Sequence, residues 1–278
     1  MVVTLPQRRN EVKKHAIRLL ALLAAFWMAL PAARSQTSTP PQLVTIVPQI
    51  VDGGAWVTTL ALTNTTTSPT QVGLSFYQET GGGSTGPWSL SFAESTSAQG
   101  QPLVLPGGTT LFLHTVGAAG TTTVGWGMIT EPYGSGTPAV SAYAVFTQRV
   151  PQQSDQEGTA EAGSTGSRFL VPFDNTNGAV TSIAIANPSA FNNSISVGVR
   201  SSAGTATQMA AITLPPGGHT SFALPTQFPV TTGQAGLAEF YGSSGGFSVL
   251  ALRFSSGSLT TSPVYAANGA PIIIGSAN

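Results

Sequence analysis

The chain contains no cysteine, and this absence limits the chemistry that it can perform. Disulfide bonds, thiolate metal sites and cysteine nucleophiles all require that residue. Charge is scarce as well, since charged residues make up 7% of the 278-residue sequence. Hydrophobic residues make up 41%, whereas disordered chains combine low hydrophobicity with high charge. The composition therefore predicts a folded protein that is held together by its core alone.

Positive charge is concentrated near the N-terminus. Five basic residues lie between Arg8 and Arg18, and an uncharged run of 12 residues, Leu19 to Leu30, follows them. Small residues stand at Ala33 and Ser35. These are the three parts of a secretory signal, and 12 apolar residues are too few to span a bilayer comfortably as an uncleaved anchor. We therefore predict a signal peptide at residues 1–35, a secreted protein that is extracellular or periplasmic, and no membrane insertion after signal removal.

The predicted mature chain has little positive charge. It has no lysine, and against nine acidic residues it keeps only four basic ones: Arg149, Arg168, Arg200 and Arg253. A nucleic-acid binder needs many Lys and Arg side chains to neutralise phosphates, and a polybasic membrane surface needs them too. Nucleic-acid binding and attachment through a basic membrane patch are therefore excluded.

Two stretches of the chain resemble each other. VPQIVDGGAWVTTLALTNT (Val47 to Thr65) in the first half matches VPFDNTNGAVTSIAIANPS (Val171 to Ser189) in the second. Farther along, LVLPGGTTLFLHT from Leu103 matches ITLPPGGHTSFAL from Ile212. Within these stretches large apolar residues alternate with smaller or polar ones, which is typical of strands with one buried face. The matches predict that the two halves share one strand plan.

Short predicted strands recur six or seven times in each half, separated by turns rich in Gly and Pro. Such spacing is typical of a sandwich or barrel. We predict an all-β fold of two tandem immunoglobulin-like antiparallel β-sandwiches after the N-terminal signal peptide. The first sandwich domain is expected at residues 42–150 and the second at 168–278. The polar, Gly- and Ser-rich segment 151–167 between them is expected to be a linker or a long loop.

Several motifs together resemble a known family. They are LPGGTT, VGWGMIT and YAVFTQRVP in the first half, and FLVPFDNTNG and LPPGGHT in the second. This combination is similar to a family of uncharacterised secreted bacterial proteins, over nearly the whole mature chain. The resemblance implies secretion and two tandem immunoglobulin-like β-sandwich repeats. It implies no catalytic residues.

Residues for catalysis are few. The mature chain has two histidines, His114 and His219, which occupy different positions in the two matching stretches. His219 directly follows a Pro-Gly-Gly turn, so we expect it at the surface. The His spacings of zinc sites are missing from the sequence, and the acidic residues are not paired as in glycosidases. We therefore expect no enzymatic activity and no cofactor.

One loop could hold calcium. Asp174, Asn175 and Asn177 supply carboxylate and amide oxygens, which are the ligands that Ca²⁺ prefers. The alternative is an Asx-type turn between two strands. The matching segment of the first half, Asp52-Gly53-Gly54, keeps only one carboxylate. This difference favours the turn, and we predict no metal site.

Three residues are candidates for contact with a partner. Tyr133 stands beside a Gly-Ser-Gly loop, Trp88 lies in an insert that the second half lacks, and Arg253 interrupts an apolar strand. Arg253 could instead be an ion-paired arginine on an outer face, and Tyr143 is expected in the core. We expect a non-enzymatic protein with a structural or adhesive role at the cell exterior, in contact with a protein or polysaccharide. An extracellular polysaccharide-binding module is the alternative.

Overall fold

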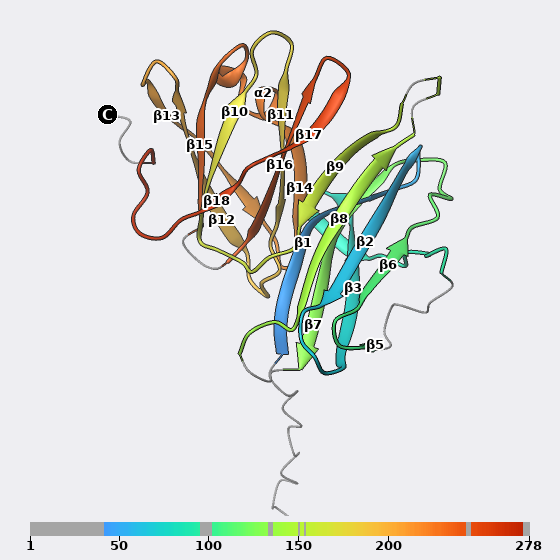
Figure 1. Cartoon of the computed structure of the whole chain (residues 1–278). Coiled ribbons are helices and arrows are strands. Elements are labelled where there is room, and N and C mark those ends of the chain that lie inside the picture. The colour runs from blue at the N-terminus through green and yellow to red at the C-terminus, as the bar shows by residue number, and fades with distance from the viewer. Residues whose placement is uncertain are drawn as a thin grey trace, which may run out of the picture. The chain divides into compact units, whose positions relative to one another are not determined.

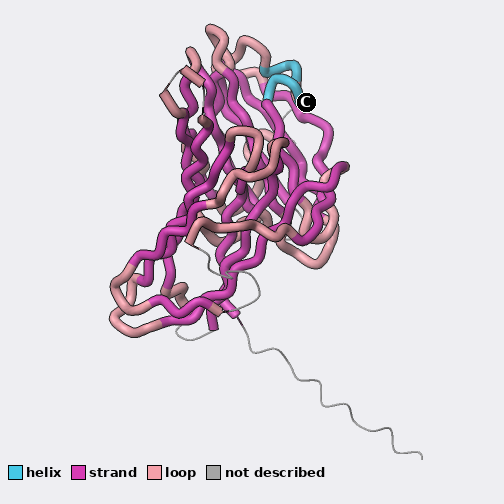
Figure 2. Tube along the Cα trace, turned by 90° about the vertical axis from the view of Figure 1, so that its right-hand side faces the viewer, coloured by secondary structure: helices cyan, strands magenta, loops and turns pink. Residues whose placement is uncertain are grey.

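The computed structural model describes residues 42–94, 102–132, 136–149, 151–152, 154–242 and 246–274, and all of them belong to one compact unit. The predicted signal peptide at residues 1–35 lies outside this range. The all-β prediction is confirmed, because nearly every regular element is an antiparallel strand (Figure 2). The described helices are only α2 (Leu224–Gln227) and the 3-10 turn η1 (Pro229–Thr231). Neither is long enough to cross a membrane.

The first half of the described chain builds two sheets (Figure 1). One has the order β1–β7–β3–β4, with β5 also paired to β3, and the other has the order β6–β2–β8–β9. The strands are β1 (Gln42–Asp52), β2 (Trp56–Asn64), β3 (Thr70–Gly81), β4 (Ser84–Pro87), β5 (Leu103–Leu105), β6 (Thr110–His114), β7 (Thr123–Pro132), β8 (Val140–Gln148) and β9 (Gln156–Glu161). Both sheets contribute side chains to one buried cluster, which we call the first core; it includes Val47, Leu74, Ile129, Leu60, Leu113 and Phe146.

The second half also builds two sheets. Their orders are β13–β12–β15–β10–β18 and β14–β11–β16–β17. The strands are β10 (Arg168–Asp174), β11 (Val180–Ala186), β12 (Asn193–Ser201), β13 (Ala206–Leu214), β14 (His219–Ala223), β15 (Ala235–Gly242), β16 (Ser248–Ser255), β17 (Ser258–Ser262) and β18 (Tyr265–Ala266). They enclose a second core, which includes Val171, Val197, Phe240, Ile183, Ile185 and Ala251. The immunoglobulin-like assignment and the domain limits stay predictions.

A buried asparagine recurs at the same place in both halves. Asn64 ends β2, and its amide donates to the carbonyl oxygens of Ser68 and Leu105. Asn187 follows β11, and its amide donates to the carbonyl oxygens of Phe191 and Leu214. A buried polar side chain is stable only when it is hydrogen-bonded. Each asparagine therefore ties the end of a central strand to the neighbouring turns, which explains why the two matching stretches share it.

The sheet β14–β11–β16–β17 is covered on both faces. Ile183 and Ile185 point into the second core, whereas Ala184 and Leu250 belong to the first core. Successive side chains of a strand point to opposite faces, so the run Ile-Ala-Ile-Ala of β11 is buried throughout. The first core is thus closed by a sheet from the other half of the chain.

The expected linker at residues 151–167 contains a strand, so the interpretation of this segment as a loop is wrong. Its central part is β9, which pairs with β8. Gly158 and Ala160 face inward, where Gly158 leaves room for the Leu259 side chain. The outward side chains of β9 are polar. At the edge of β9 that does not pair with β8, the Thr159 backbone amide donates to the Thr261 hydroxyl of β17. Small inward residues hid the strand pattern in the sequence.

A turn from the second half docks onto the first half. His219, expected at the surface, is fully buried. Its Nδ1 lies 2.7 Å from the Glu79 carboxylate and its Nε2 lies 3.0 Å from the Pro48 carbonyl oxygen. The Gly217 carbonyl oxygen accepts hydrogen bonds from the Trp126 indole and from a threonine hydroxyl. These contacts join β14 of the second half to β1 and β3 of the first.

We expect His219→Ala to lower the free energy of unfolding by about 2–4 kcal/mol, because it leaves a carboxylate and a buried carbonyl without their partner. Urea unfolding followed by fluorescence measures the loss. His114→Ala is the matched control. Since the side chain of His114 is 53% exposed and pairs with Glu94 at the surface, its removal should cost less than about 0.5 kcal/mol. Equal losses in the two variants would contradict the docking role of His219.

Candidate functional site

The structure separates the three residues expected to contact a partner. Tyr133 lies outside the described residues. Trp88 is only 8% exposed and belongs to the first core, so its prediction as a contact residue is wrong. Its backbone amide donates to the carbonyl oxygen of Phe76, which folds the insert back over the core. Phe92, two alternations later, is buried with it. The period of two within the insert was the available signal for burial.

Arg253 forms an ion pair with Asp174. One Asp174 oxygen lies 2.7 Å from the guanidinium of Arg253. The other accepts hydrogen bonds from the backbone amide and the hydroxyl of Thr176, at 3.0 and 2.6 Å. The Thr176 hydrogen bonds, together with Arg253, lower the pKa of Asp174 to about 2. Both carboxylate oxygens are therefore engaged within the protein, and a partner role for Arg253 stays a prediction.

The other residues of the possible calcium loop are arranged as a turn. Asn175 is buried, donates to the Thr231 carbonyl oxygen and accepts from the Thr181 amide. Asn177 has a φ of +52° and is followed by a glycine that also has positive φ. Among the described residues, no three His, Cys, Asp or Glu side chains gather as metal ligands do. A calcium ion would have to displace Arg253 from Asp174.

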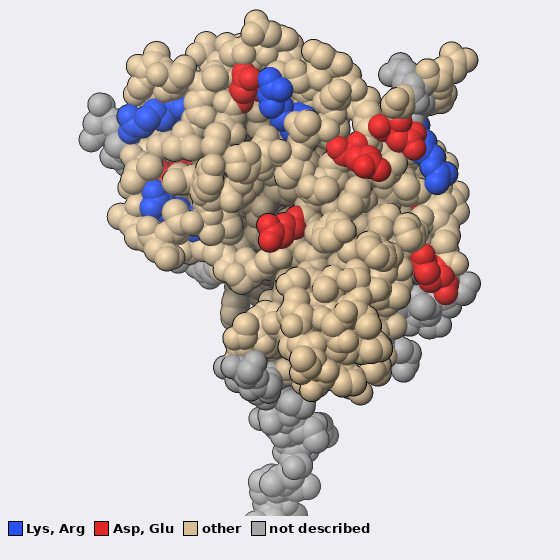
Figure 3. All heavy atoms as spheres, viewed as in Figure 1, with Lys and Arg blue, Asp and Glu red and all other residues tan. Residues whose placement is uncertain are grey.

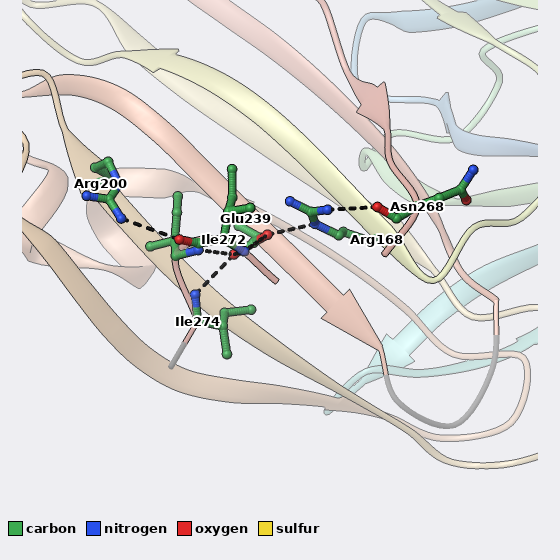
Figure 4. Close-up of polar contacts among 7 residues, drawn as sticks. Arg168, Arg200, Glu239, Asn268, Ile272 and Ile274 are labelled. Carbon is green, nitrogen blue, oxygen red and sulfur yellow. Dashed lines mark hydrogen bonds and ion pairs between the residues drawn. The ribbon is translucent and has the colours of Figure 1, made fainter. Parts of the chain in front are cut away.

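A buried carboxylate holds the C-terminal segment (Figure 4). Glu239 of β15 is fully buried and accepts hydrogen bonds from the backbone amides of residues 272, 273 and 274. The Arg168 guanidinium lies 2.7 Å away and also donates to the Asn268 carbonyl oxygen. Burial raises the pKa of Glu239, but the amides and Arg168 outweigh it, so the pKa lies below its usual value. The carboxylate is an anchor surrounded by donors, not a group poised to take a proton.

Two aromatic side chains stand on the outer face of β6–β2–β8–β9. Phe112 and Tyr143 are 46% and 42% exposed. Both lie directly opposite Ala61 of the central strand, one on each side. Neighbouring strands are about 4.8 Å apart, so the two rings start from positions roughly 10 Å apart. We call this surface the aromatic face.

Hydroxyl and ionisable groups surround the two rings. The hydroxyls of Thr63 and Thr110 lie 2.9 Å apart in the next row of the same face. Glu161 lies opposite Tyr143 in register. His114 lies 2.5 Å from the Glu94 carboxylate. Partial burial raises the pKa of Glu94, but hydrogen bonds from the backbone and side chain of His114 outweigh it and lower the pKa. Flat aromatic rings beside hydroxyls and carboxylates can stack on, and hydrogen-bond to, an uncharged polar ligand.

The sequence interpretation missed this face because it placed Tyr143 in the core. The core positions of β8 are instead Ala142, Ala144 and Phe146. Large residues are usually inside, and the small alanines misled the assignment. The signal that could have found Tyr143 was its spacing of three residues from Phe146, which places the two on opposite faces of a strand.

The face of the molecule in Figure 3 carries little charge. In Figure 3 the acidic and basic side chains are scattered, and large areas between them are uncharged. Two of the four arginines outside the predicted signal peptide, Arg168 and Arg253, are engaged in ion pairs. This face therefore offers mainly uncharged groups to its surroundings.

Comparison with known proteins leaves the family open. No protein-family model matches the chain, and a comparison with curated protein sequences finds no match either. The resemblance to secreted bacterial proteins therefore stays a prediction. What the chain does has to follow from the chemistry of its surfaces.

We expect Asp174→Asn to lower the melting temperature at pH 7, because the amide keeps the turn but loses the ion pair with Arg253. The pKa of Asp174 is lowered from 3.8 to about 2, so the stabilisation is present above about pH 4 and is lost as the pH falls through 2. Melts between pH 7 and pH 2 should show the wild type converging on the variant. Asp155→Asn, on an exposed aspartate, is the control. A pH-independent difference would contradict this assignment.

Proposed function

We propose that the protein is a non-enzymatic β-sandwich protein with an adhesive role at the cell exterior, and that it makes contact through the aromatic face. The observation that carries the proposal is the pair of half-exposed rings, Phe112 and Tyr143, on the outer face of one sheet. Exposed aromatic residues are enriched at contact surfaces because they bury a large apolar area at little entropic cost. The predicted signal peptide supports the location.

The corresponding face of the second half supports an adhesive role. Ala61 lies between Phe112 and Tyr143, and Ala184 lies between Ser221 and Leu250 in the matching sheet. That second face is buried against the first half of the chain, since Ala184 and Leu250 belong to the first core. In the second half, the outer face of the sheet β14–β11–β16–β17 therefore already packs against another part of the protein. The aromatic face is its exposed counterpart.

The environment of the ionisable groups supports a non-enzymatic role. Both histidines lie against glutamates, His114 with Glu94 and His219 with Glu79. His219 also contacts a backbone carbonyl oxygen and is fully buried. Glu239 is surrounded by donors. A general base must be free to reach the proton that it abstracts, and His219 and Glu239 are buried and engaged in holding the fold.

A polysaccharide is the second candidate ligand for the same face. Sugar rings stack on aromatic side chains and hydrogen-bond through their hydroxyls, and the threonine hydroxyls and Glu161 flank the two rings. The low surface charge favours a neutral saccharide chain over a polyanion. This candidate differs from adhesion to a protein in its ligand, but it uses the same residues.

The proposal is tested with residues 36–278, which omit the predicted signal peptide. We expect the protein to be retained on washed cell envelopes of the source organism, and the double variant Phe112→Ala with Tyr143→Ala to bind at least about tenfold more weakly. The matched control is Phe191→Ala with Tyr265→Ala, because these rings are 72% and 55% exposed elsewhere. The control should bind as the wild type does.

Two outcomes separate the candidates. Retardation of the wild type, but not of the aromatic-face variant, in gels containing a neutral polysaccharide would favour the saccharide ligand. Loss of envelope retention after protease treatment of the envelopes would favour a protein partner. Equal retention of the wild type and the aromatic-face variant would refute the proposal.

A further inference from the structure

A cavity lies where the sheet β14–β11–β16–β17 covers the first half. Its volume is about 300 Å³, the lower end of the range for small-molecule sites, which often lie between packed units. The walls are mainly apolar: Trp56 and Phe146 line it from the first half, and Ala184 and Leu250 from the second. Ser182 and Ser221 add hydroxyl groups.

The cavity has a cause in the sequence. Ala184 lies opposite Ser221 on one side and Leu250 on the other. The matching row of the first half holds Ala61 between two aromatic rings. Ser221 and Leu250, which stand in place of the two rings, fill less space than they do, so a space remains where the two halves meet. The contacts of His219 and Trp126 at the docking turn fix the separation of the halves, which keeps the space from collapsing.

A polar group beside the cavity lacks a partner. Gln49 lines the cavity and is 9% exposed, and its Oε1 accepts no hydrogen bond from the described part of the chain. A buried acceptor without a donor is unfavourable. The terminal torsion of a glutamine is broad, so the amide can turn toward a donor that enters the cavity. The described residues that line the cavity include no charged side chain.

We propose that this cavity binds a neutral, mainly apolar small molecule that carries one hydrogen-bond donor. The apolar part packs against Trp56 and Phe146, and the donor is accepted by Gln49. Neutrality follows from the uncharged lining, since a charge would lose its hydration without gaining a partner. The site is separate from the aromatic face and does not depend on the proposed function.

The first experiment uses residues 36–278 and two probes of similar shape. N-phenyl-1-naphthylamine has two aromatic groups and one N–H donor, whereas 1-phenylnaphthalene has no donor. We expect the fluorescence of the amine to rise saturably with protein, and the hydrocarbon to displace it with about tenfold weaker affinity, equivalent to about 1.4 kcal/mol. Energy transfer from tryptophan to the amine should fall in Trp56→Phe, because Trp56 lines the cavity, and Trp88 and Trp126 remain as more distant donors.

Variants locate the site. Ser182→Phe fills the cavity and should weaken binding of the amine at least tenfold. Ser194→Phe places the same ring on the exposed side of β12 and should leave binding unchanged. Gln49→Leu should make the two probes bind equally. If Ser182→Phe fails to fold, the Gln49 and Trp56 variants still decide. The proposal is overturned by a lack of saturable binding, by equal wild-type affinity for both probes, or by binding that Ser182→Phe leaves intact.

Discussion

The structure depends on the burial of one sheet on both of its faces. β14–β11–β16–β17 supplies isoleucines to the second core and Ala184 and Leu250 to the first. Apolar area removed from water stabilises a fold in proportion to its extent, so neither half keeps its full core without the other. The docking turn fits this arrangement, because His219 and Trp126 satisfy their polar groups across the same boundary. Without cysteine, this shared burial does the work that disulfides do in many secreted proteins.

The two halves share an arrangement of strands, but the outer face of the matching sheet is buried in the second half and exposed in the first. The row of Ala184 is covered by the first half, and its residues are small or aliphatic. The row of Ala61 has no such cover among the described residues and carries Phe112 and Tyr143, both half-exposed. Packing does not account for the two neighbouring rings, since Val140, the alanines and Phe146 already fill the core side of β8. The contact surface proposed above would give them a role.

The alternation of residues and the turn motifs predicted much of the fold, but they did not predict the aromatic face. Period-two alternation, the Pro-Gly-Gly turns and the shared asparagines Asn64 and Asn187 indicated strands and a repeated plan, and the antiparallel sheets confirm the all-β class. The errors at β9 and Tyr143 arose because the inward residues of these strands are small, whereas His219 is buried by a distant part of the chain. Alternation tells which residues share a face, but it does not tell which face another part of the chain covers. That information lies in contacts between residues far apart in the sequence, such as Glu79 with His219.

The cavity and the aromatic face lie at matching places in the two halves, at the row of Ala184 and at the row of Ala61. Where the outer row of the sheet fits against another part of the chain, Ser221 stands in the place that Phe112 takes in the first half, and a space is left. Where the row is exposed, it carries the two aromatic rings. An arrangement selected for packing alone would fill the space and avoid the unpartnered oxygen of Gln49, since each is unfavourable in a core. Their presence together at one boundary is the reason to expect a ligand there.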